Sequence, residues 1–121
     1  MRRRANSWGF TIVEVMVVIV IIIILTAIMV FAFGTWRSRT ATTEVKNALM
    51  SVAQGMKNER TFTGSYPLTV PTTYSPQPGV TVAYVSGSAT AYCIRGTSTT
   101  VSTVVLYIRS ADPTPSSTVC T

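Results

Sequence analysis

The sequence predicts an α+β protein in which one long N-terminal helix packs on a small antiparallel β-sheet. An apolar block runs from Phe10 to Phe33, and apolar residues then recur at helical spacing as far as Met56. Beyond residue 80 the chain contains three short runs rich in Val, Ile, Thr and Tyr, which are typical of strands. About 90 residues lie outside the apolar block, enough for one small domain.

The apolar block predicts a helix that can span a membrane. Its only charged residue is Glu14, and at about 1.5 Å per residue the block gives a helix of about 36 Å, against about 30 Å for a bilayer core. It has no polar face, as expected for a helix embedded in lipid or in the core of a bundle. Residues 10–34 are therefore predicted to be a transmembrane helix.

The helical pattern continues beyond Gly34, but with two different faces. One face carries Val45, Ala48, Leu49, Val52 and Met56, and polar residues take the other positions. No proline interrupts the chain before Pro67, so residues 35–60 are predicted to be an amphipathic continuation of one helix that runs from about Phe10 to about Arg60.

Residues 61–121 are predicted to form a small β-sheet region. Prolines and glycines between 64 and 79 indicate a loop, and strands are expected at 80–86, 90–95 and 101–109. The short connections favour an antiparallel meander whose apolar face covers the helix. The proline-containing tail from Asp112 is expected to be loose and held by Cys120.

Charge and composition argue against catalysis. The chain has no histidine and only four widely spaced acids, so we expect no catalytic residues, no metal site and no cofactor. The net charge is +6, and Arg2, Arg3 and Arg4 supply half of it just before the apolar block, a pattern that keeps that end in the cytoplasm. The other cations are scattered and indicate a solvated face, so nucleic-acid binding has no support in the sequence.

Two cysteines, Cys93 and Cys120, lie in the region expected outside the membrane, where disulfides persist. We expect them to pair with each other. The alternative is a buried Cys93 in a strand and a free thiol at Cys120.

The segment GFTIVEVMVVI resembles the signal segment of type IV prepilins, in which a short basic leader ends in glycine and phenylalanine follows. Gly9, Phe10 and Glu14 match the positions that matter in that family. The resemblance implies a type IV pilin-like fold and a leader at residues 1–9. It also implies cleavage between Gly9 and Phe10 by prepilin peptidase, and N-methylation of Phe10.

The resemblance also implies a location and partners. The precursor would be a single-pass protein of the cytoplasmic membrane, surrounded by lipid and delivered to the pilus assembly machinery there. Identical subunits would then pack by their helices into an extracellular filament used for adhesion, motility or DNA uptake. In the filament, Glu14 is expected to pair with the Phe10 amine of a neighbouring subunit, because a buried carboxylate needs a positive partner.

The sequence departs from many filament-forming pilins at two positions. Phe31 stands where they have proline, and Ile23 where they often have glycine. Since every unpaired backbone group is costly in an apolar core, we expect continuous helix from about Thr11 to at least Ala32, with any break at Gly34.

Two other functions remain open at this point. A pseudopilin or minor pilin of a type II secretion or competence system shares the same leader, helix and cleavage. A secreted or membrane-anchored binding module would instead use the first 34 residues as an ordinary signal or anchor. The first residue of the mature protein, Phe10 or one near Thr35, separates the binding module from the pilin-like proteins.

Overall fold

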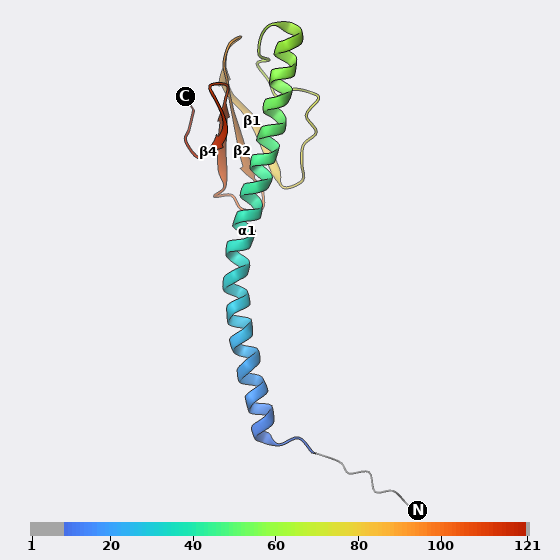
Figure 1. The fold of residues 1–121 in the computed structure, drawn as a ribbon, viewed down its shortest axis with the longest axis vertical. Helices are drawn as coiled ribbons and strands as arrows, with labels where there is room; N and C mark the ends of the chain where they lie inside the picture. Colours follow the sequence, from blue (N-terminus) through green and yellow to red (C-terminus); the bar gives the residue numbers. More distant parts are fainter. Residues whose placement is uncertain (1–8, 121) are drawn as a thin grey trace, which may run out of the picture. The chain divides into compact units, whose positions relative to one another are not determined.

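A computed structural model describes residues 9–120 of the chain. Its elements, in order, are the helix α1 (Ile12–Thr63) and the strands β1 (Val80–Gly87), β2 (Tyr92–Ser98), β3 (Val105–Arg109) and β4 (Asp112–Ser116). The chain divides into two compact units between Thr35 and Trp36. The first unit contains the apolar part of α1, and the second contains the rest of α1 and the sheet (Figure 1).

In the first unit the helix is regular and its side chains are exposed. Every residue from Gly9 to Arg39 is exposed, and α1 continues through Gly34 without a break. The helix is long and apolar enough to cross a membrane by length and composition. The β-branched run from Val17 to Ile24 is helical although such residues have slightly lower helix propensity.

In the second unit one antiparallel sheet has the strand order β1-β2-β3-β4, so each strand pairs with its neighbour in sequence. Figure 1 shows this sheet beside the last turns of α1, drawn in green. Val82 pairs with Gly96 between β1 and β2, and Gly96 pairs with Leu106 between β2 and β3. The meander places alternate residues of the central strands against the helix.

The core of this unit forms between α1 and the sheet. The five residues predicted as the buried stripe of the helix are all buried, and Ala41 and Ala53 extend the stripe. Across from them lie Val80, Tyr92, Ile94, Leu106 and Ile108. At about 1.5–3 kcal/mol for each large apolar side chain, this burial is the main stabilising contribution in so small a unit.

The close approach of sheet and helix depends on Gly96. A Cβ atom added at Gly96 would lie 2.8 Å from Cγ1 of Val45 and 3.0 Å from Cγ of Leu49, closer than carbon atoms normally pack. The glycine therefore lets β2 lie against α1 at this point.

The predicted helix and strands are confirmed as elements, but some of their bounds differ. The helix continues to Thr63, and Gly64 follows with a φ of +81°, as is common for the glycine after a helix. The third strand begins at Val105 and not at 101. The reason is a turn held by Ser98, whose buried hydroxyl accepts hydrogen bonds from the backbone N–H groups of Thr100 and Val101.

The expectation of a loose tail was wrong for residues 112–116, which form β4. Tyr107 pairs with Ser116 and Arg109 with Asp112, across an irregular register. Pro113 and Pro115 are compatible with this strand because it lies at the edge of the sheet, where a missing N–H breaks few ladder bonds.

Asp112 orders the beginning of β4. Its Oδ1 accepts hydrogen bonds from both the hydroxyl and the backbone N–H of Thr114. These two bonds, and more weakly the charge of Arg109, hold the pKa of the Asp112 carboxyl below its usual value. The sequence-based prediction missed β4 because proline usually argues against a strand.

Candidate functional site

The first turn of α1 brings Glu14 close to Thr11. The backbone N–H of Glu14 lies 3.3 Å from Oγ1 of Thr11 and 3.1 Å from its carbonyl oxygen, and the N–H of Val15 also donates to that carbonyl. Thr11 is therefore the N-cap of the helix, and Glu14 occupies the third helical position. An acidic residue in the first turn also interacts favourably with the helix dipole.

Gly9 and Phe10 precede the helix and are exposed. No described atom outside its chain neighbours lies within 4 Å of a Cβ added at Gly9, and 76% of the Phe10 surface is accessible. The fold therefore does not require a glycine at position 9. Within residues 9–120, no packed element covers the peptide bond between these two residues.

The apolar segment from Phe10 to Phe33, helical from Ile12, presents a continuous hydrophobic surface on all sides. Exposed Ile, Val, Leu, Met and Phe side chains make up this surface, with Glu14 as its only charge. Contiguous apolar patches on soluble monomers rarely exceed a few hundred Å². A surface of this kind must be covered by lipid or by other apolar helices.

A disulfide joins Cys93 in β2 to Cys120, with the two Cα atoms 6.1 Å apart. Both residues are buried, and Cys93 lies on the face of the sheet opposite the side chains that contact α1. The bridge fastens the end of the described chain to the central part of the sheet. The predicted pairing is thus confirmed, and the alternative with a free Cys120 is not.

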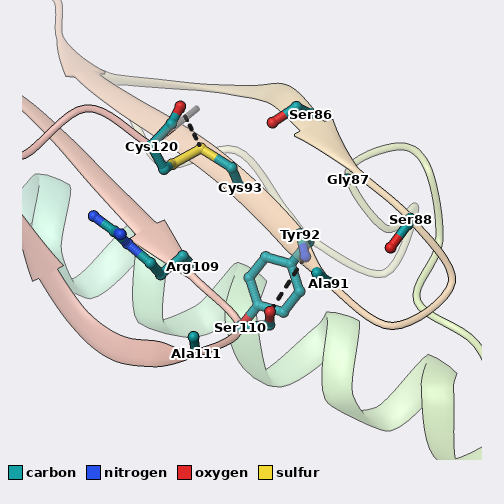
Figure 2. A pocket seen from close by; sticks show the side chains of 10 residues that line it. All are labelled: Ser86, Gly87, Ser88, Ala91, Tyr92, Cys93, Arg109, Ser110, Ala111 and Cys120. Carbon is teal, nitrogen blue, oxygen red and sulfur yellow. Dashed lines mark hydrogen bonds between the residues drawn. A yellow bond between two sulfur atoms is a disulfide. The ribbon is translucent and has the colours of Figure 1, made fainter.

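Beside the disulfide lies a hollow of about 230 Å³ (Figure 2). It is formed mostly by small residues at the end of β1 and in the β1–β2 and β3–β4 connections, together with Tyr92 and Arg109. Ser110 closes this end of the sheet, since its N–H donates to the Tyr92 carbonyl and its Oγ accepts from the Tyr92 N–H. The hollow offers one charged side chain and no arrangement suited to catalysis.

Tyr92 is the central residue behind this hollow. Burial raises the pKa of its hydroxyl, and the neighbouring Tyr66 acts in the same direction. The two rings meet edge to face with centroids 4.8 Å apart, an arrangement that aromatic pairs favour. The contact is a packing interaction within the core of the second unit.

Among residues 9–120, no group of three or more potential metal ligands lies together. Two features of the described residues stand out. One is the apolar helix, which is capped by Thr11 and carries Glu14 in its first turn. The other is the sheet, which is cross-linked by the Cys93–Cys120 disulfide.

Comparison with known families identifies the first of these features. A family model for the prokaryotic N-terminal methylation motif matches residues 6–30. The chain carries the type IV prepilin-like signature. No curated protein matches the chain.

The match covers the predicted leader end, Gly9, Phe10, Glu14 and most of the apolar helix. Together with the α+β fold of one long N-terminal helix on a four-stranded antiparallel sheet, it supports a precursor of the pilin or pseudopilin type. Proteins with this signature are structural rather than enzymatic as a family. The signature and the apolar helix fit a membrane-anchored precursor.

Sequence reasoning missed the role of Thr11. The signal was present, because Thr11 followed by Glu14 three residues later matches the start of a capping box before an apolar run. The GSYP turn predicts that Tyr66 packs against the end of the helix, and the contacts of Tyr66 with Arg60 agree with this prediction. Of the predicted leader, residues 1–8 lie outside the described residues.

Proposed function

We propose that this chain is the precursor of a structural subunit of a type IV pilus. Prepilin peptidase cuts it between Gly9 and Phe10 and methylates the new amine of Phe10. The subunit is first anchored in the cytoplasmic membrane and is then assembled with identical subunits into an extracellular filament. The observation that carries this proposal is the prepilin-like signature on a fully exposed apolar helix.

The chemistry of the helix start supports such an assembly. Cleavage creates a positive amine at Phe10, four residues before the Glu14 carboxylate. In a dry bundle of apolar helices each of these charges is unfavourable alone, and together they form a pair. A neighbouring subunit that supplies the amine to Glu14 therefore fixes the axial position of one helix against the next.

The second unit supports a role outside the membrane. Its disulfide is a feature of oxidising compartments, and its core is complete without the apolar part of α1. Residues 10–34 would then form the core of the filament, and the sheet would cover that core.

The proposal is tested by replacing Gly9 in cells that lack other copies of the subunit. Gly9→Leu places a bulky side chain at the cleavage site and should leave the precursor uncut, because the peptidase needs a small, flexible residue there. The structure has free space at this position, so a loss of processing is not explained by misfolding.

Gly9→Ala is the matched control, since it adds only a methyl group, and most of the chain should still be cut. The mass of the recovered chain reports the cleavage. Normal maturation of Gly9→Leu would show that the proposed site is wrong. Recovery of the mature chain as the main component of surface filaments distinguishes a pilus subunit from a minor pilin or a pseudopilin.

A further inference from the structure

The end of α1 contains a cationic hollow that the proposed function does not use. It has a volume of about 420 Å³ and is lined by Lys57, Arg60, Thr61 and Tyr66. Both charged residues of this lining are cations. Glu59, the nearest acid in sequence, lines a different hollow on the helix together with Phe62.

Arg60 is held in place by Tyr66. Its Nη1 donates to the Tyr66 hydroxyl at 3.1 Å, and its Cζ lies 4.7 Å from the centroid of the Tyr66 ring. Tyr66 is itself fixed, because it is buried, contacts the ring of Tyr92 and donates its backbone N–H to the Ala89 carbonyl. The guanidinium is thus oriented while most of its five N–H donors remain for other acceptors.

Lys57 lies on the same face of the helix, since residues three apart are neighbours. Within residues 9–120, no ion pair joins Lys57 or Arg60 to an acidic side chain. Both cations therefore face the hollow without a compensating carboxylate. The Tyr66 hydroxyl accepts from Arg60, so its own proton is available to a further acceptor.

Basic residues near a helix C-terminus often serve only to satisfy its last carbonyls. Here the carbonyl of Arg60 already accepts the N–H of Gly64 at 2.7 Å. Within residues 9–120, the side chains of Lys57 and Arg60 donate to none of the last carbonyls of α1, so they do not act as caps.

We propose that this hollow binds a phosphate group. The planar guanidinium of Arg60 offers paired donors to two phosphate oxygens, Lys57 supplies a second positive charge, and the Tyr66 hydroxyl donates to a third oxygen. This inference is independent of the proposed pilus function, because it concerns only residues of the second unit.

The test uses the ¹⁵N-labelled full chain in nonionic detergent, titrated with inorganic phosphate at constant ionic strength maintained with sodium chloride. The Arg60 Nε–H and Gly64 N–H resonances should shift in a saturable manner. Lys57→Gln and Arg60→Gln should each weaken the affinity by about tenfold or more, as expected for loss of a charged hydrogen bond. Tyr66→Phe keeps the ring and should weaken binding by a smaller factor.

Lys46→Gln is the matched control, because it removes the same charge from an exposed position on the same helix. It should change the affinity by less than about twofold, given the screening of distant surface charges. Lys57 is also exposed, so its variant remains folded even if Arg60→Gln does not.

A second titration of the same chain uses methyl phosphate. Equal binding of methyl phosphate indicates a site for phosphate esters carried by larger molecules, whereas binding of inorganic phosphate alone restricts the site to the free ion. Either result supports the phosphate site. Shifts that do not saturate, or an equal loss of affinity in Lys46→Gln and Lys57→Gln, would overturn it.

Discussion

At the residue scale, Glu14 has two separable interactions. As the third residue of α1 it stabilises the helix start, since an acidic side chain there complements the helix dipole, and its N–H is capped by Thr11. As the only charge on an apolar surface, it is also the group that most needs a partner when that surface is buried. The first interaction exists in the isolated chain, and the second requires another subunit.

Replacing Glu14 by Gln should therefore affect assembly much more than insertion. Removal of the charge makes the apolar helix easier to insert, and loss of a first-turn acid lowers helix stability by only about 0.3–1 kcal/mol. We expect normal amounts of the Glu14→Gln chain in the membrane, with few or no filaments in the electron microscope. Glu59→Gln, an exposed acid at the other end of α1, serves as the control and should assemble normally.

Full piliation by Glu14→Gln as the sole subunit would contradict the charge pairing. In that case Glu14 would not be the required partner of the N-terminal amine in the filament.

The packing of α1 on the sheet leaves no room for a side chain at Gly96. Gly96→Ala should reduce the free energy of unfolding of the second unit by about 1–3 kcal/mol, because the added methyl group meets Val45 and Leu49 at less than normal contact distance. Thermal unfolding followed by near-UV circular dichroism, to which the buried rings of Tyr66 and Tyr92 contribute, measures this change.

Gly55→Ala is the matched control for Gly96→Ala. Its Cβ would meet Pro71 at an ordinary 3.4 Å, and alanine favours the helix, so this variant should be as stable as the parent or slightly more stable. An equally stable Gly96→Ala would show that β2 can move away from α1 at little cost.

At the element scale, the disulfide and β4 act together. The bridge closes a loop between residues 27 positions apart, which corresponds to about 3.5 kcal/mol on the chain-entropy model. The loop includes β3 and β4, and β4 is a short edge strand with two prolines and an irregular register. The bridge therefore supports the weakest strand of the sheet.

Reduction should release the end of the sheet before it disturbs the helix. In hydrogen exchange of the full chain in detergent, we expect residues 110–120 to lose protection first, while α1 and β2 keep theirs until the unit unfolds. Cys93→Ser with Cys120→Ser should behave as the reduced protein does. Two alkylated thiols in protein taken from non-reduced filaments would exclude the bridge.

The sequence predicted the elements that depend on local periodicity, and it missed those that depend on contacts. The stripe from Val45 to Met56 is visible as a 3.6-residue pattern, so the buried face of α1 was predicted correctly. β4 was missed because Pro113 and Pro115 are tolerated only at a sheet edge, and strand order is not a local property. The shift of the third strand to Val105 depends on hydrogen bonds to Ser98.

The residues of the candidate site also divide into those visible in the local sequence and those that depend on tertiary contacts. Gly9, Phe10 and Glu14 stood out because their spacing before an apolar block is a motif in the sequence itself. The pairing of Cys93 with Cys120 was expected because these are the only cysteines of the chain. The packing of Tyr66 against the end of the helix was predicted from the GSYP turn, but its hydrogen bond to Arg60 was not, because that bond depends on how the loop after Gly64 turns back.

At the scale of the whole molecule, the chain combines two units with opposite solvent requirements. The first exposes an apolar surface that water cannot cover favourably, and the second has its own core and a disulfide. A subunit that is first held in a membrane and later packed into a filament satisfies both requirements. A binding module with an ordinary signal sequence would lose the first unit on secretion.

The mass and N-terminal sequence of the chain recovered from purified surface filaments test this account most directly. It predicts a chain that starts at Phe10, with the amine N-methylated, that carries the intact Cys93–Cys120 bridge, and that forms the main component of the filaments. A chain that starts near Thr35, or that is released into the medium without residues 10–34, would contradict it.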